Sequence, residues 1–245
     1  MDIPRSAPPL PDRAVLSQRW SSACFLHWRV DPDVVAPLLP AGTRPDTFDG
    51  SAWVGLIPFV LSEFRVAAAP ALPLIREFIE INVRTYAVDG AGRRGVVFRT
   101  LEAQHLLPVL GARTLFGLPY RWARASRHED GADVVYTSSR RGRSEARTRI
   151  GVTRGDGPVD TPLSRFLTAR WGFHQRHLGR TVWAANSHEP WPLVAARLNE
   201  LDDTLVADAG FPGLVGRTPD SVLAMPAGHP GVVTDFSRSR RIPRD

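Results

Sequence analysis

The sequence contains no lysine, a single cysteine and no long apolar run. All 31 of its lysine-or-arginine positions are arginine. Arginine stays protonated near neutral pH, so no side chain can serve as the amine of a lysine Schiff base, and that class of covalent catalysis is excluded. The one cysteine, Cys24, excludes an internal disulfide. The lack of disulfides and an N-terminus without an apolar signal segment together predict a cytoplasmic protein. No apolar run approaches the ~20 residues of a membrane span, so we expect no membrane partner.

The composition that is present is that of a globular domain. Hydrophobic residues make up 43% of the chain and charged residues 23%, which excludes an intrinsically disordered protein. At 245 residues the chain is long enough to bury a substantial core. We expect a flexible arm over residues 1–16, a single domain over 17–236 and a basic, frayed tail over 237–245.

Short segments of alternating apolar and polar residues follow one another along the chain. They predict strands at 22–30, 47–64, 77–88, 96–103, 120–127, 132–139, 145–152 and 181–188. Helical patterns are fewer, and they fall at 31–42, 110–117, 161–171 and about 200–209. Many short strands with few helices are typical of a mainly β protein, and we predict an antiparallel β-barrel or sandwich.

Three motifs suggest chemistry but fail in their context. The segment GAGRRG (90–95) has the dinucleotide-binding spacing, yet a strand follows it where a helix must begin, so a hairpin turn explains its glycines better. His174 and His177 have a spacing that could place two metal ligands on one helix face, but no further ligand lies nearby in sequence. Cys24 lies among large apolar residues and is expected to be a buried, inert thiol. We therefore predict no metal and no cofactor.

Six arginines lie between Arg140 and Arg154, and more follow in the C-terminal tail. Such a run allows a nucleic-acid-binding or protein-binding function. Arg147 and Arg149 are spaced two apart, however, as on the solvated face of an edge strand, and a chain without lysine must use arginine for its ordinary surface. Nucleic acid is therefore a disfavoured partner.

The segment FIEINVRTY (78–86) carries an unusual set of side chains on one face. By the two-residue period of a strand, that face holds Phe78, Glu80, Asn82, Arg84 and Tyr86. It could meet solvent, but aromatic rings mixed with a carboxylate, an amide and a guanidinium are also the lining of a small-ligand cavity. The segment CFLHWRV (24–30) places His27 and Arg29 on one face in the same way. Alternation alone leaves open whether either face points inward.

Several blocks resemble the uncharacterised DUF2071, or YqjF-like, family. They include FLHWRVDPDVVAPLLPAG, EINVRTYAVDG, GARTLFGLPYRWARA, FLTARW and HEPWPL, in one order from about residue 20 to about 210. That family is similar to the acetoacetate decarboxylases, and the resemblance implies an antiparallel β-barrel around a central cavity. In the decarboxylases a lysine pair follows a proline, and Tyr120-Arg121 stands at the similar position here. The family's aromatic-x-Glu segment resembles FIE, which makes Glu80 the matching residue and favours an inward direction for its face.

These residues predict a cavity for a small carboxylate or oxo-acid. We expect Glu80 to act as a general acid or base, Tyr120 to donate a hydrogen bond to an oxyanion, and Arg121 to stabilise negative charge. Arg84, Asn82, Arg29 and His27 are predicted to bind the substrate. Such an enzyme would be lyase- or isomerase-like. One alternative is a non-catalytic binding or sensing module. Another is that the same residues form a buried Glu–Arg pair that holds the barrel closed without any ligand. The resemblance also allows a homo-oligomer.

Overall fold

The computed structural model describes residues 3–67, 77–105, 117–142 and 144–242. The predicted helical turns at 110–117 lie almost entirely outside these ranges. The strands all join one 15-stranded sheet. In chain order they are β1 (Leu16–Ser21), β2 (Cys24–Val30), β3 (Thr43–Pro45), β4 (Ala52–Val66), β5 (Glu77–Asp89), β6 (Arg94–Ala103), β7 (Tyr120–Asp130), β8 (Asp133–Arg140), β9 (Arg147–Pro158), β10 (Gly172–His177), β11 (Arg180–His188), β12 (Val194–Asp203), β13 (Ser221–Ala224), β14 (Val232–Phe236) and β15 (Arg240–Arg241).

The described helices are short. They are α1 (Pro32–Val35), the 3₁₀ turn η1 (Ala36–Leu38), α3 (Pro162–Thr168), α4 (Leu205–Asp208) and the 3₁₀ turn η2 (Pro212–Leu214). Helix α3 begins where the sequence predicts, because Thr161 and Ser164 form a capping box and Pro162 occupies the first turn. Asp31 likewise caps α1 through the backbone N–H of Asp33.

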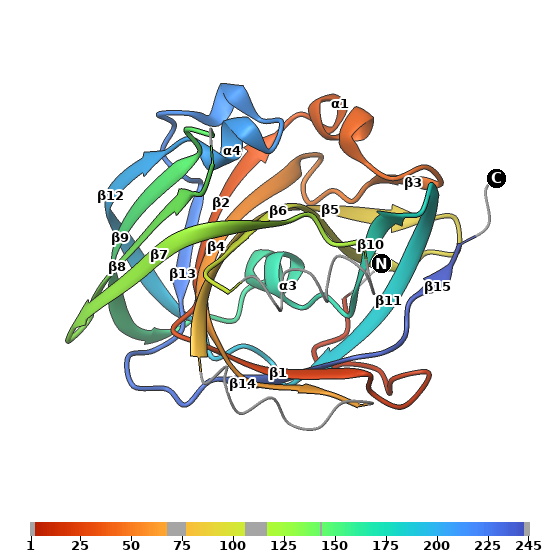
Figure 1. Ribbon diagram of the computed structural model, residues 1–245, viewed down its shortest axis with the longest axis horizontal. Helices are drawn as coiled ribbons and strands as arrows, with labels where there is room; N and C mark the ends of the chain where they lie inside the picture. Colours follow the sequence, from red (N-terminus) through yellow and green to blue (C-terminus); the bar gives the residue numbers. More distant parts are fainter. Residues whose placement is uncertain (1–2, 68–76, 106–116, 143, 243–245) are drawn as a thin grey trace.

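The mainly β prediction is confirmed, but the sheet is mixed and forms no single antiparallel barrel. Strand β6 pairs in parallel with both β7 and β10. The pairings close into two circuits that share β4, β5 and β6. The first circuit runs β1-β14-β11-β10-β6-β5-β4 and back to β1, and the second runs β6-β7-β8-β9-β12-β13-β2-β4-β5. Figure 1 shows the first circuit as a ring and the second as a lobe beside it.

The two faces of the shared strands supply two separate cores. On β5, Ile79, Ile81 and Val83 pack in the core of the second circuit, whereas Phe78 and Tyr86 pack in that of the first. The same alternation divides β4, so every second residue of one strand serves a different core. The face of β5 that carries the polar side chains therefore belongs to the first circuit.

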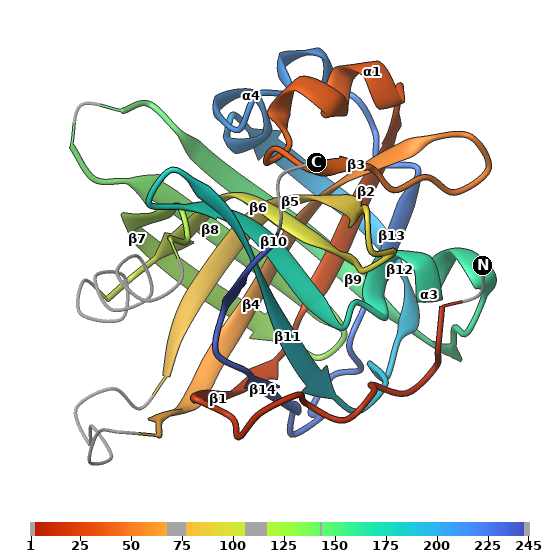
Figure 2. The same ribbon diagram turned by 90° about the vertical axis from the view of Figure 1, so that its right-hand side faces the viewer.

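Helix α3 covers one end of the first circuit (Figures 1 and 2). Its Phe166 packs against Tyr86 of β5, with 5.7 Å between ring centroids, and against Phe48 at 5.4 Å. The last carbonyls of a helix have no partner within it and must bind donors from elsewhere. In α3 these carbonyls point into the first circuit. They accept hydrogen bonds from side chains of the site described below and so fix where those side chains lie.

Two local predictions are wrong. The segment 200–209 was expected to be helical, but strand β12 continues to Asp203 because its pairing with β9 outweighs the helical propensity of its leucines and glutamate, and α4 spans only four residues. The tail was expected to fray, but Arg240 and Arg241 pair with β11 as strand β15. None of the helices within the described ranges is long and apolar enough to cross a membrane.

Candidate functional site

The polar face of β5 points into the first circuit, and its side chains are buried. Glu80 is 1% exposed, Asn82 and Tyr86 are fully buried, and Arg84 is 6% exposed. Ionisable groups in such a place must be paired, neutralised or held for a ligand. The partners of each group decide which of these applies.

Glu80 is neutralised by its surroundings. Tyr120, from the start of β7, donates its hydroxyl hydrogen to Glu80 Oε2 at 2.7 Å. Burial raises the pKa of Glu80 to about 8, although the side chains of Tyr120 and Asn82 oppose this shift. Burial and the neighbouring carboxyl also raise the pKa of Tyr120 well above its usual value. At neutral pH the pair is therefore a protonated acid held by a neutral phenol.

A small hollow of about 30 Å³ lies beside this pair, and we call it the Glu80 hollow. Among the described residues that line it, all are apolar apart from Gln18, Glu80 and Tyr120. Such a volume has room for a water molecule but not for a larger ligand.

Arg84 lies four residues further along β5 and is held by backbone and aromatic partners. Its Nη2 donates to the carbonyl of Leu167 in α3 at 3.1 Å, and its Nε donates to Tyr86 Oη at 3.2 Å. Tyr86 donates its own hydrogen to the same carbonyl at 2.8 Å, so His27 Nε2 must be the donor in its 2.7 Å bond to Tyr86 Oη. Burial and the nearby Arg84 charge lower the pKa of His27 well below its usual value, which keeps that ring neutral.

A glycine opposite His27 makes room for this arrangement. Gly55 of β4 pairs with both His27 and Arg84 in the sheet. A Cβ at Gly55 would lie 2.8 Å from His27 Nε2 and 2.7 Å from Ile57 Cδ1. The missing side chain is therefore what allows His27 to reach Tyr86.

Arg84 has no carboxylate partner among the described residues. It uses two of its five N–H donors, and neither goes to an acid. The neighbouring Arg170, by contrast, pairs with Asp46, which also binds Arg94 at 2.8 Å. Burial opposes ionisation of Asp46, but Arg170 and Arg94 outweigh it and lower its pKa. Arg84 is thus a buried cation without a counter-ion in the part of the chain that the structure describes, and it forms no ion pair with Glu80.

A second hollow of about 30 Å³ adjoins Arg84, and we call it the Arg84 hollow. Four buried polar atoms of its lining have no hydrogen-bond partner among the residues described. They are Trp20 Nε1, Arg170 Nη2, Asn186 Oδ1 and Thr234 Oγ1. Such atoms are rare in folded proteins, where buried polar groups are nearly always paired. Because donors dominate this set, the hollow suits an anion.

The two hollows adjoin one another. Trp20, Phe98, Phe173 and Phe236 line both of them. Arg170, Asn186, Thr234 and Trp20 were not among the residues that the sequence predicted. Arg170 lies in the block FLTARW, so that block held a signal, but Asn186 and Thr234 enter the site only through the pairing of β11 with β14.

Two predicted site residues lie elsewhere. Arg121 is exposed, because it follows Tyr120 on strand β7 and successive strand residues point to opposite faces. Arg29 lies at the surface, where its guanidinium stacks 5.0 Å above the ring of Trp53 and is 3.7 Å from Asp49. Neither can contact a ligand beside Arg84.

The other sequence motifs contribute no site. His174 and His177 lie on strand β10 at opposite faces, and His174 bonds to the carbonyl of Arg93 at 3.0 Å. The first four residues of GAGRRG form the turn between β5 and β6, and its last two residues begin β6. Burial raises the pKa of the Cys24 thiol to about 12. Within the described ranges, no three His, Cys, Asp or Glu side chains lie close enough to share a metal ion.

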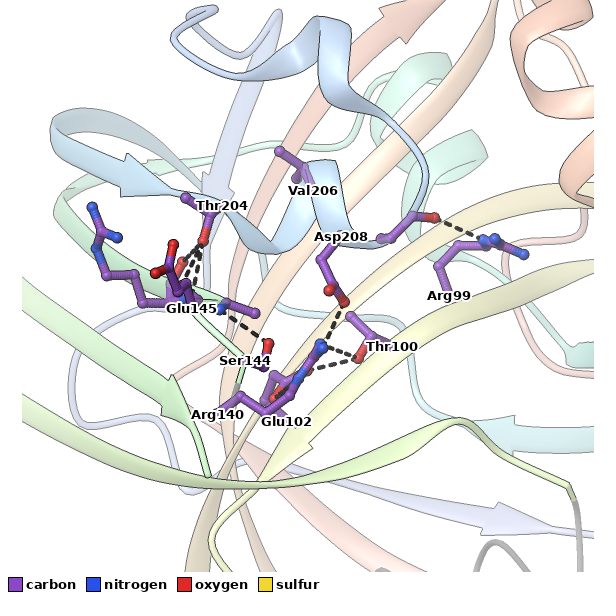
Figure 3. Close-up of polar contacts among 12 residues, drawn as sticks. Arg99, Thr100, Glu102, Arg140, Ser144, Glu145, Thr204, Val206 and Asp208 are labelled. Atoms are coloured by element: carbon purple, nitrogen blue, oxygen red, sulfur yellow. Dashed lines mark hydrogen bonds and ion pairs between the residues drawn. The ribbon is translucent and has the colours of Figure 1, made fainter. Parts of the chain in front are cut away.

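Most of the described arginines between 140 and 154 are neutralised. Arg140 binds the buried Glu102 at 2.6 Å and Asp208 at 2.7 Å (Figure 3). Arg147, Arg149 and Arg154 also have carboxylate partners. This pairing leaves little free positive charge to attract a nucleic-acid backbone.

The mixed sheet with two circuits is the fold of the acetoacetate-decarboxylase-like proteins. Residues 17–229 match the model of the DUF2071 family, described as an uncharacterised conserved protein, and the chain belongs to this family. It is 33% identical over 198 residues to the uncharacterised protein YqjF of Bacillus subtilis, covering 80% of this chain and 81% of that protein.

Two solved structures share the fold at low sequence identity. Acetoacetate decarboxylase from Legionella pneumophila superposes with a TM-score of 0.68 at 12% identity, covering 99% of this chain and 92% of that one. The enduracididine biosynthesis enzyme MppR complexed with pyruvate superposes with a TM-score of 0.60 at 17% identity, covering 97% and 92%.

Proposed function

We propose that this chain binds a small oxo-acid inside the first circuit and transfers a proton to it without a Schiff base. The observation that carries the proposal is the buried, unpaired Arg84 in the same interior as the neutral Glu80. A buried guanidinium without a counter-ion is costly, and a carboxylate that binds it bidentately would remove that cost. The pyruvate complex of MppR, which shares this fold, supports an oxo-acid as the ligand class.

In this proposal the carboxylate of the ligand lies between Arg84 and Arg170. The unpartnered Nη2 of Arg170 and the free donors of Arg84 supply its hydrogen bonds. The hollow is too small for the ligand as it stands, so the rings that separate the two hollows move when it binds.

Glu80 supplies the proton. Because its pKa is about 8, it is mostly protonated at neutral pH and can act as a general acid that donates its proton to the carbonyl oxygen of the ligand. The proton leaves Glu80 for the ligand, and the carboxylate left behind keeps the hydrogen bond from Tyr120, which becomes charge-assisted and stronger. Tyr120 thus stabilises the product form of the acid.

Thermal unfolding with pyruvate and with its uncharged amide tests the binding step. Arg84→Met removes the unpaired cation. Arg99→Met is the matched control, since Arg99 also donates to backbone carbonyls, those of Ala209 and Leu38, but does not line either hollow. We expect pyruvate to raise the melting temperature of the wild type and of Arg99→Met, but not of Arg84→Met, and the amide to raise none. An equal shift in Arg84→Met would overturn the proposal.

A further inference from the structure

A larger pocket opens beside α3, outside the first circuit. Its volume is about 570 Å³, within the range of small-molecule sites. Its lining combines aromatic rings and prolines, among them Trp171, Trp191, Pro158, Pro190 and Pro192. We call it the outer pocket.

The walls of the outer pocket suit a flat apolar group. Trp171 and Trp191 both pack against His188, each with its ring centroid 4.7 Å from the histidine ring. Burial lowers the pKa of His188 to about 4, so that ring is neutral at physiological pH and presents no charge to the pocket. The charged groups of the lining include Arg165 and Arg5, and both pair with Asp160.

The outer pocket and the Arg84 hollow share a wall one side chain thick. Thr168, His188 and Trp191 line both spaces. The indole Nε1 of Trp191 donates to the carbonyl of Thr168 at 3.2 Å, which is at the long end of the normal range. Joining the two spaces requires Trp191 to rotate away from the rings of Trp20 and Phe25, which it contacts with centroid distances of 5.5 and 5.9 Å.

We propose that the outer pocket holds an aromatic substituent of the ligand whose carboxylate binds Arg84. The inference rests on the proposed function and narrows its substrate to aromatic oxo-acids. The carboxylate lies on the guanidinium side of the shared wall, the ring lies between Trp171 and the prolines, and Trp191 turns aside to let the connecting carbon atoms pass. A pyruvate-sized ligand would leave the outer pocket unused.

Equilibrium binding of phenylpyruvate and pyruvate, measured by calorimetry, tests this proposal. We expect the wild type to bind phenylpyruvate at least tenfold more tightly than pyruvate. Val159→Trp fills the outer pocket, and Trp171→Leu removes one of its aromatic walls, while neither residue lines the Arg84 hollow. Both variants should lose the preference for phenylpyruvate and keep the affinity for pyruvate. Trp122→Leu, at an exposed tryptophan remote from the pocket, is the control and should keep the preference.

The outcomes separate this inference from the proposed function. If the wild type binds both acids equally, or if both outer-pocket variants keep the preference, the outer pocket is not the site of the ring and the proposed function still stands. If neither acid binds, or if Arg84→Met binds both as the wild type does, the proposed function fails and this inference fails with it. Val159→Trp reduces the volume of the outer pocket and Trp171→Leu increases it. If one of these variants misfolds, the other still tests the inference.

Discussion

Glu80 and Glu102 are two buried glutamates one ladder position apart, and they are stabilised in different ways. Glu80 on β5 opposes Ala103 on β6, while the next residue of β5, Ile81, opposes Glu102. This step of one residue sends the two carboxyls to opposite faces of the sheet and so into different circuits. Glu102 meets Arg140 and Thr100 (Figure 3), whereas the partners of Glu80 among the described residues are neutral, chiefly Tyr120.

The same contrast holds for the two arginines. Arg140 in the second circuit has two carboxylate partners, and Arg84 in the first has none among the described residues. A buried ion pair with complete hydrogen bonding is weak support for a ligand site, because it satisfies itself. Buried polar groups that lie apart in one interior and lack hydrogen-bond or ionic partners can be satisfied by a bound ligand. The comparison is consistent with a structural role for the second circuit, and it supports the proposed ligand-binding role of the first.

The largest expected effect comes from Glu80→Gln, measured as stability against pH. Below pH 4.5 Glu80 is protonated in both the folded and the unfolded chain and contributes no pH dependence. As the pH rises from 4.5 to about 8 the unfolded chain loses this proton and the folded chain keeps it, so stability falls; above pH 8 the loss is complete. The shift corresponds to roughly 5 kcal/mol. Urea unfolding should show Glu80→Gln gaining that amount relative to the wild type across this window.

The companion variant for this measurement is Tyr120→Phe. Because the hydrogen bond from Tyr120 lowers the pKa of Glu80, its loss should extend the fall in stability to higher pH. A difference between wild type and Glu80→Gln that stays flat from pH 4.5 to 8 would mean that Glu80 is already ionised in the fold, and the contrast with Glu102 would disappear.

Arg140→Met should change stability by nearly as much, but in the opposite direction, because it destabilises the fold. It leaves the fully buried Glu102 without its cation, which costs about 3–5 kcal/mol in comparable pairs. Replacing both partners, as Arg140→Met with Glu102→Leu, should recover most of that loss, because no buried charge remains. Denaturant unfolding of the three variants measures this; a cost below about 1 kcal/mol for the single change would show that Glu102 finds another partner.

Gly55→Ala tests the crowding on the first-circuit face alone. Its Cβ would press on the ring of His27 and on Ile57, and overpacking of this kind costs about 1–3 kcal/mol. Gly213→Ala is the control, since a Cβ there has no atom within 4 Å. Thermal unfolding should separate the two variants. Equal stability would mean that His27 can turn away from Tyr86 without loss.

Much of the local structure could be predicted from alternation and capping, but the closure of the sheet could not. Residues 77–88 alternate strictly and form β5, the turn after them leads into β6 as predicted, and Thr161 with Pro162 starts α3 as expected. The closing pairs join segments far apart in sequence, such as β1 with β14, and no local pattern specifies such partners. Residues 200–203 show the limit, because pairing with β9 overrides their helical propensity.

The candidate site was predictable in half of its residues. Alternation brings Glu80 and Arg84 to one face, and that face is buried. The same rule forbids Tyr120 and Arg121 from pointing the same way, so the prediction of Arg121 as a site residue contradicted the very pattern that identified Glu80. Thr234 and Asn186 could not be found in this way, since they meet Arg84 only after the first circuit closes.

The smallest expected effect on stability belongs to Arg84→Met, and this variant is the most direct test of the comparison between the two circuits. The change removes two hydrogen bonds, but Tyr86 still donates to the carbonyl of Leu167, and a methionine can fill the apolar part of the space. Each hydrogen bond from a charged donor is worth about 1.5–3 kcal/mol, and release from an unpaired buried charge offsets most of that loss. Denaturant unfolding without ligand should therefore show Arg84→Met within about 1 kcal/mol of the wild type, far from Arg140→Met. If the two variants lose similar stability, the role of Arg84 is structural: it caps the end of α3, just as Arg140 serves as the structural partner of Glu102. The distinction between the circuits would then fail, even if the pH profile of Glu80 behaves as expected.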